Sequence, residues 1–212
     1  HRRPRVACFF TGDELVMPGQ PLPAGGIYNS NRFVLNALLR RLGCEVLDLG
    51  IVPDSREATR QALREAAEGA DLIISAGGVS VGEEDHVRPA VEAEGQIDLW
   101  RVAIKPGRPL AYGRVGRHGP EGARAAVPGS FAHFIGLPGN PVSAYVTFLL
   151  FVRPFVLRLQ GIQAVEPQAV TLISGFDWTN PDRRREFLRA VHLPDGRLGL
   201  FREQGSAVLT SA

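Results

Sequence analysis

The residues Ser75-Ala-Gly-Gly-Val-Ser-Val-Gly-Glu-Glu-Asp-His86 form the loop around which the rest of the chain is arranged. The apolar run at residues 70–74 precedes the loop and predicts a buried strand, and residues 86–94 predict a helix after it. Strand, glycine loop and helix in this order direct free backbone N–H groups and a helix dipole towards an anion. We therefore expect Gly77 and Gly78 to let the backbone approach a phosphate-like group.

Three carboxylates, Glu83, Glu84 and Asp85, follow the glycines directly and would repel such an anion. A hard divalent cation such as Mg²⁺ resolves this conflict, because it bridges carboxylate and phosphate oxygens. The first hypothesis is therefore a phosphate or nucleotide site that contains a metal ion. A structural turn with solvated acids is the alternative without a ligand.

Ser80 suggests a third interpretation of the same loop. Gly78-Val-Ser80-Val-Gly82 matches the G-x-S-x-G motif of serine hydrolases, and histidines that could complete a triad follow in the chain. The acidic run after Ser80 suits an oxyanion-stabilising loop poorly. We therefore favour the phosphate site, with Ser80 as a residue that binds the ligand.

Composition narrows the class of protein. The 212 residues are 44% apolar, which is enough to bury a core, and the formal charge of +2 is too small to indicate nucleic-acid binding. Cys8 and Cys44 lie among apolar residues and predict buried free thiols in a reducing compartment. We expect a cytoplasmic protein without a signal peptide. The apolar run at residues 142–159 contains two arginines and a proline, so we expect a core helix and no membrane span.

Strand-like and helix-like segments alternate over the first three quarters of the chain. This alternation predicts a three-layer α/β/α fold with a mostly parallel sheet over residues 1–163. After Gly161 the pattern changes to short alternating strands, which predict a small antiparallel β domain over residues 164–212, cut short at Ala212. The expected strands are residues 5–10, 45–49, 70–75, 99–104, 131–135, 170–174, 186–191 and 198–202, and the expected helices are residues 32–42, 56–68, 86–94 and 141–159.

Carboxylates follow three of the expected parallel strands. Glu14 follows the first strand, Asp54 the second and Asp85 the third. Ligands bind beyond the carboxyl ends of strands in an open parallel sheet, so we expect these acids to meet at one edge. Each acid taken alone could be a solvated loop residue, and Asp54 could cap its helix. The three together favour a metal or acid–base role.

Lys105 and Arg108 add positive charge at the end of a further expected strand. Lys105-Pro-Gly-Arg-Pro109 is stiffened by its prolines, and apolar residues flank it on both sides. Two cations held in this way could face one oxyanion, and an arginine can bind it through two parallel hydrogen bonds. A solvated basic turn is the alternative.

Five motifs follow one another from about Arg5 to Gly161: Thr11-Gly-Asp-Glu-Leu15, Ile27-Tyr-Asn-Ser-Asn31, the loop of residues 75–85, Ile104-Lys-Pro-Gly-Arg-Pro109 and Gly136-Leu-Pro-Gly-Asn-Pro-Val-Ser-Ala144. Two shorter motifs come later, Arg185-Glu-Phe-Leu-Arg189 and Gln204-Gly-Ser206. The five motifs in register resemble the MoeA / gephyrin E-domain family, the molybdopterin molybdenumtransferases, and the two shorter ones resemble the beginning of the C-terminal β domain of that family.

The resemblance implies an enzyme that inserts molybdate into adenylylated molybdopterin and releases AMP, with Mg²⁺ as cofactor and a homodimer as the full-length form. It implies catalytic roles for Glu14, Asp54, Asp85 and Lys105, with Asp54 and Asp85 as metal ligands. The substrate-binding residues that it implies are Gly77, Gly78, Ser80, Arg108, Pro109, Pro138, Pro141, Ser143, Arg189 and Ser206.

The chain also departs from the family pattern. Arg101 and Arg108 stand where the family often has lysine, and the two N-terminal domains of the family do not precede this segment. Two alternatives stay open: a related adenylyltransferase or nucleotide hydrolase of the same fold, and a gephyrin-like scaffold. Residues 79–85 favour the insertion enzyme over the adenylyltransferase or hydrolase. The retained carboxylates Glu14, Asp54 and Asp85, together with Lys105, favour it over the scaffold.

Overall fold

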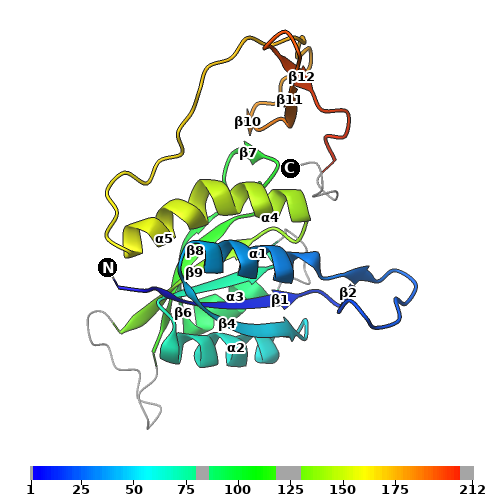
Figure 1. The fold of residues 1–212 in the computed structure, drawn as a ribbon. Helices are drawn as coiled ribbons and strands as arrows, with labels where there is room; N and C mark the ends of the chain where they lie inside the picture. The colour runs from blue at the N-terminus through cyan, green and yellow to red at the C-terminus, as the bar shows by residue number, and fades with distance from the viewer. Residues whose placement is uncertain (1, 80–85, 118–129, 206–212) are drawn as a thin grey trace.

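The computed structural model describes residues 2–79, 86–117 and 130–205 and is built around one six-stranded sheet of order β4-β1-β5-β9-β8-β6 (Figure 1). β1 pairs in parallel with β4 and β5, and β5 with β9, whereas β8 runs antiparallel to both of its neighbours. The expected mostly parallel sheet is confirmed. Its strands are β1 Arg5–Thr11, β4 Glu45–Val52, β5 Leu72–Ala76, β6 Gly95–Trp100, β8 Ala111–Gly116 and β9 Phe131–Leu137.

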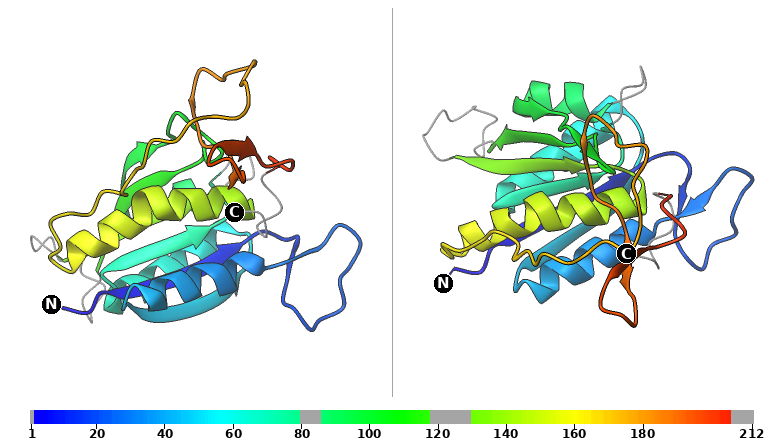
Figure 2. Two further views of the ribbon diagram at one scale, coloured as in Figure 1. Left: turned by 45° about the horizontal axis from the view of Figure 1, so that its top comes forward. Right: turned by 90° about the horizontal axis from the view of Figure 1, so that it is seen from above.

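Helices cover both faces of this sheet, which gives the expected three layers (Figures 1 and 2). α1 and the long helix α4–α5 lie on one face, and α2 and α3 lie on the other. Asn29 caps α1 through a hydrogen bond from the Arg32 N–H, and Ser55 caps α2 in the same way through the Ala58 N–H. The bounds are α1 Ser30–Arg41, α2 Arg56–Gly69, α3 Val87–Glu94, α4 Pro141–Thr147 and α5 Arg153–Leu159.

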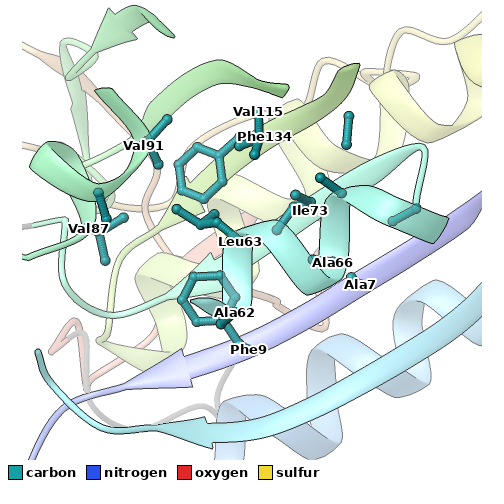
Figure 3. Packing of buried hydrophobic residues seen from close by; sticks show 14 of the residues in the cluster. Ala7, Phe9, Ala62, Leu63, Ala66, Ile73, Val87, Val91, Val115 and Phe134 are labelled. Atoms are coloured by element: carbon teal, nitrogen blue, oxygen red, sulfur yellow. The ribbon is translucent and has the colours of Figure 1, made fainter. Parts of the chain in front are cut away.

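The alternation of side chains along each strand divides the core into two layers. Ala7 and Phe9 of β1 pack with Leu63 of α2 and Phe134 of β9, as Figure 3 shows, whereas the intervening Cys8 belongs to the opposite layer beneath α1 and α4–α5. Successive residues of β5 and β9 divide in the same way. The sheet is therefore buried on both sides, which explains why its central strands are nearly uniform apolar runs.

The two cysteines are free and buried, as expected. Burial raises the pKa of the Cys44 thiol to about 11 and raises the pKa of the Cys8 thiol further still. Both therefore stay protonated and pack as small apolar side chains.

The helix of residues 141–159 is continuous but contains a π-helical segment, Phe148–Val152, between α4 and α5. Phe148, Val152 and Val156 are buried on the side that faces the sheet. By length and composition this helix would suffice to cross a membrane. In the structure, one of its faces packs in the core layer that lies between the helix and strands β5 and β9.

Two predicted strands were wrong: the strand of residues 99–104 in its extent, and the strand of residues 170–174 in its existence. Residues 99–104 are not one strand: β6 ends at Trp100, Arg101 has a φ of 82°, and a separate strand β7, Ile104–Lys105, follows. The chain leaves the sheet here because a left-handed residue cannot continue a strand. Residues 170–174 form no strand either. Val170 is 82% exposed, and only Ser174 makes an isolated bridge, to Leu198, so the alternating pattern lacks a partner.

The segment after α5 returns across the molecule to the end of the sheet near β7 (Figure 1). β10, Arg185–Glu186, pairs in parallel with β7, so the expected strand of residues 186–191 is divided between β10 and β11. β11, Ala190–His192, and β12, Leu198–Leu200, form an antiparallel hairpin around the expected turn at residues 194–196. A further short parallel pair, β2 Leu15–Val16 and β3 Ile27–Tyr28, forms an arm that projects from the sheet.

Leu63→Ala should lower the free energy of unfolding by about 2–5 kcal/mol, because it opens a cavity between α2 and the sheet. Leu63 is fully buried, whereas Leu47 is 43% exposed and provides a matched control. Leu47→Ala should change stability by about 0.5 kcal/mol or less. Urea unfolding of both variants measures the difference, and equal losses would contradict the assigned core.

Candidate functional site

A pocket of about 620 Å³ lies where several strands of the main sheet end. Its walls come from the segments that follow β1, β4, β5 and β9, which is where ligands bind in open parallel sheets. We name it the strand-end pocket. It is lined by Thr11, Gly12, Glu14, Leu15, Ile27, Tyr28, Asn29, Ser30, Asn31, Asp54, Ala76, Gly77, Gly78, Val79, Pro109, Pro138, Gly139, Asn140, Pro141 and Ser143.

Two of the expected carboxylates meet in this pocket. Glu14 is exposed, and Asp54 is half-buried and accepts a hydrogen bond of 3.2 Å from the Thr11 hydroxyl. Because Ser55 caps α2, Asp54 is not needed as the cap and presents its carboxylate to the pocket. The strand-end pocket therefore has an acidic wall built from two separate chain segments.

Gly77 and Gly78 have positive φ angles of 100° and 62°. A Cβ at Gly77 would overlap the carbonyl oxygen of Thr11, and one at Gly78 would lie 2.5 Å from Val87 Cγ2. The glycines are therefore required first by the protein itself, since they let the loop after β5 pack against the end of β1 and the beginning of α3. From the sequence, we expected these two glycines to let the backbone approach a ligand.

The loop between β9 and α4 forms another wall. Asn31, at the beginning of α1, donates from Nδ2 to the Gly139 carbonyl at 2.7 Å and so fixes this loop against α1. Pro141 occupies the first turn of α4, where its missing N–H costs nothing, and Ser143 is 5% exposed. Pro138, Pro141 and Ser143 thus line the pocket.

A second pocket of about 350 Å³ adjoins the first, because Pro109 and Ser143 line both. We name it the basic pocket. It lies between the loop after β7 and the C-terminal segment, and it contains Lys105 and Arg108. Its lining is Lys105, Pro106, Gly107, Arg108, Pro109, Ser143, Trp178, Arg184, Glu186, Phe187, Leu188 and Gln204.

Lys105 and Arg108, the two cations of this pocket that the sequence predicted, differ in their partners. The Lys105 ammonium lies 3.0 Å from Glu186 Oε1 and 3.7 Å from Asp182 Oδ2. Arg108 is exposed and makes no ion pair with another described residue. Arg108 is therefore the cation of this pair whose charge the described acids leave uncompensated.

The acids beside Lys105 remain ionised well into the acidic range. Hydrogen bonds from the side chain and backbone of Arg184 hold the pKa of Asp182 far below its usual value. The pKa of Glu186 is lowered by the Asp182 N–H, by the Trp178 indole N–H at 2.8 Å and by Lys105. This network ties the C-terminal segment to the loop after β7.

The structure brings most of the expected site residues to these two adjoining pockets and leaves a few elsewhere. Arg189 is not among the lining residues of either pocket: its guanidinium donates to the Gly205 carbonyl at 2.7 Å. Asp85, Ser80 and Ser206 lie outside the described residues, so their roles stay predictions. The expected site residues in the strand-end pocket are Glu14, Asp54, Gly77, Gly78, Pro138 and Pro141. The expected site residues in the basic pocket are Lys105 and Arg108, and Pro109 and Ser143 line both pockets.

Several lining residues were not expected from the sequence. Trp178, Phe187 and Gln204 reach the basic pocket only because β10 pairs with β7, a contact between segments about eighty residues apart that no local pattern signals. Asn29 and Asn31 belong to one of the five family motifs. Their position in the strand-end pocket follows from the direction in which α1 begins.

A three-layer fold with an acidic pocket at its strand ends and a basic pocket beside it defines an α/β domain suited to phosphorylated ligands. Residues 7–158 match the family described as "Probable molybdopterin binding domain" (MoCF_biosynth), and the chain belongs to this family. The resemblance inferred from the five motifs is thereby confirmed.

Relatives of known name agree with this assignment. The chain is 45% identical over 161 residues to the molybdopterin molybdenumtransferase of Haemophilus influenzae, covering 76% of this chain and 36% of that protein. It is 37% identical over 210 residues to the enzyme of the same name from Nostoc sp., covering 97% of this chain and 45% of that protein. The crystal structure of the molybdopterin biosynthesis MoeA protein from Pyrococcus horikosii matches with a TM-score of 0.73 and 28% identity, covering 99% of this chain and 48% of that one. The chain thus spans less than half the length of these relatives.

Gly77→Ala should destabilise the protein by at least about 1–3 kcal/mol, because an L-residue is strained at this φ and its Cβ would overlap Thr11. Gly139→Ala is the matched control in the same pocket, since its Cβ would meet nothing closer than 3.7 Å. Chemical denaturation should show a loss for Gly77→Ala alone. Equal stability of the two variants would contradict the packing described for the loop.

The tie between the C-terminal segment and Lys105 should depend on pH. Since folding lowers the pKa values of Asp182 and Glu186, their contribution is complete above the unfolded values near pH 4 and is lost as the pH falls through the lower folded values. In a Trp100→Phe background, Trp178 fluorescence should therefore change only below about pH 4.

Lys105→Gln should move this fluorescence midpoint to higher pH, because it removes a cation that favours ionised Glu186. Arg183→Gln removes the same charge from an exposed neighbouring position and should leave the midpoint in place. A midpoint that both variants shift equally would show a general charge effect and contradict the specific contact.

Proposed function

We propose that this domain binds adenylylated molybdopterin in the strand-end pocket and molybdate in the basic pocket. In the whole protein, molybdenum would then be inserted into the pterin dithiolene with release of AMP. The observation that carries this proposal is that Pro109 and Ser143 line both pockets, so that an acidic wall and a basic wall belong to adjoining pockets. The names of the relatives from Haemophilus influenzae and Nostoc sp. support the same activity.

The acidic wall suits Mg²⁺. Glu14 and Asp54 offer hard carboxylate oxygens in one pocket, and Mg²⁺ typically takes one or two carboxylates together with water and substrate phosphates. Among the described residues no group of three His, Cys, Asp or Glu side chains forms a complete metal cage, which agrees with a site that substrate oxygens would complete. When bound, Mg²⁺ would neutralise phosphate charge as AMP departs. We propose Asp54 and Asp85 as its ligands and Glu14 as a nearby acid–base residue.

The basic pocket suits a tetrahedral dianion. Arg108 supplies an uncompensated guanidinium, which can bind two oxygens of one oxyanion, and Ser143 supplies a hydroxyl donor at the junction. Lys105 is held by Glu186 and Asp182, so we propose that it orients the loop and adds a partly compensated positive charge. Arg189 and Ser206, both in the C-terminal segment, stay predicted substrate-binding residues.

The remaining expectations belong to the same proposal. The division into residues 1–163 and 164–212 stays a prediction, and so do a cytoplasmic location and a homodimeric full-length protein. Small-molecule substrates follow from the two pockets. A related adenylyltransferase or hydrolase and a scaffold stay as alternatives, and the names of the relatives favour the insertion enzyme.

Arg108→Gln should weaken molybdate binding by about tenfold or more and leave AMP binding unchanged, because a charge-assisted hydrogen bond to the oxyanion is lost. Asp54→Asn should do the reverse: it should weaken binding of AMP in the presence of Mg²⁺ and leave molybdate binding unchanged. Isothermal titration of this chain with molybdate, and separately with AMP and Mg²⁺, measures both.

Two variants provide matched controls for charge. Arg41→Gln and Glu68→Gln change exposed residues that line neither pocket and should alter neither affinity. If Arg108→Gln and Asp54→Asn weakened both ligands equally, or neither ligand, the assignment of one ligand to each pocket would be wrong.

A further inference from the structure

Asn29 holds an unused hydrogen-bond donor in the wall of the strand-end pocket. The residue is 2% exposed, and its Nδ2 makes no hydrogen bond with any described residue. Buried side-chain donors nearly always have a partner, so an unsatisfied one beside a pocket indicates a group that a ligand would satisfy.

The orientation of this amide is fixed by the helix that it caps. Its Oδ1 accepts from the Arg32 N–H at 3.1 Å, so the NH₂ end of the side chain is the end that has no partner among the described residues. Asn29 itself lines the strand-end pocket. The cap therefore decides which end of the amide is available, and that end is a donor.

The beginning of α1 adds a second attraction for negative charge. Ser30 and Asn31 open this helix of 12 residues and line the same pocket. The N–H groups of a first helical turn have no acceptor within the helix, and Asn29 occupies only that of Arg32. The positive end of the helix dipole thus lies at the wall to which Asn29 belongs.

The acids of the pocket limit what this wall would bind. Glu14 and Asp54 line the same space and would repel a free anion, but they would accept one whose charge a cation offsets. A phosphate that contacts the metal with some oxygens could turn another oxygen to Asn29 and the beginning of α1.

We propose that Asn29 and the N-terminus of α1 form a phosphate-binding subsite, in which Asn29 Nδ2 donates to a phosphate oxygen of the adenylylated substrate. The inference rests on the proposed function, since it places the phosphate of that substrate within the strand-end pocket. It assigns Asn29 two simultaneous roles, as the cap of α1 through Oδ1 and as a binding residue through Nδ2.

Asn29→Asp separates these two roles. Aspartate keeps the oxygen that caps α1 and replaces the donor with a negatively charged acceptor. Asn29→Ser also keeps a capping oxygen but removes the donor without adding charge. Asn29→Ser should keep the cap, because Asn and Ser cap helices about equally well, whereas Asn29→Asp also buries a charge and should lower the unfolding midpoint. Binding is therefore compared at a temperature at which both variants are folded.

The probes are AMP and adenosine, each titrated calorimetrically into this chain with Mg²⁺. AMP affinity should fall about tenfold in Asn29→Ser and by about 10- to 100-fold in Asn29→Asp, whereas adenosine affinity should not change. Gln61→Glu, an exposed position on α2 outside the strand-end pocket, adds the same charge and should leave both affinities as they are.

Two results would overturn the subsite alone: AMP affinity within twofold of the wild type in both Asn29 variants, or equal weakening of AMP and adenosine. In either case the wild type still binds AMP, and the proposed function stands. A wild-type chain that binds no AMP in the presence of Mg²⁺ would overturn the subsite together with the placement of adenylylated molybdopterin in this pocket.

Discussion

The close approach of the loop after β5 to the end of β1 is the contact on which the strand-end pocket depends. Gly77 and Gly78 leave no space for a side chain between this loop, the Thr11 carbonyl and Val87 of α3. β1 and β5 are paired neighbours in the sheet, and because the loop lies this close to the end of β1, the residues that follow both strands line one pocket with Asp54. The glycines thus shape the pocket by packing against protein, and any contact with a ligand is an addition to that role.

Charge is distributed so that each pocket has its own character. The strand-end pocket collects Glu14 and Asp54 from separate segments, while the basic pocket is formed only when the C-terminal segment packs against the loop after β7. There, Glu186 and Asp182 compensate Lys105, whereas no acid in the described part of the chain compensates Arg108. We propose that the strand-end pocket binds a phosphate together with a metal ion and that the basic pocket binds an oxyanion. The separation of the pockets keeps the carboxylates of the first away from the oxyanion in the second, which they would repel.

Much of the fold could be predicted because its signals are local. The apolar run of β1, the capped amphipathic helix α2 and the proline at the first turn of α4 each carry their structure in adjacent residues. Predictions failed where a strand needed a partner from elsewhere. Residues 170–174 alternate like a strand but pair only at Ser174, and residues 99–104 are interrupted by the left-handed Arg101. Extended segments are stabilised by their neighbours in the sheet, and a sequence window does not contain those neighbours.

The sequence by itself determined the parallel three-layer architecture, the family and the edge at which Glu14, Asp54 and the glycine loop meet, because the carboxyl ends of parallel strands lie together whatever the details of packing. Only the tertiary structure decided that β10 pairs with β7, that Trp178 and Gln204 reach the basic pocket, and that Asn29 has one bonded and one unused end. These features depend on distances between segments far apart in the chain and on which hydrogen bonds are left unmade. Such distances exist only once the whole core has packed.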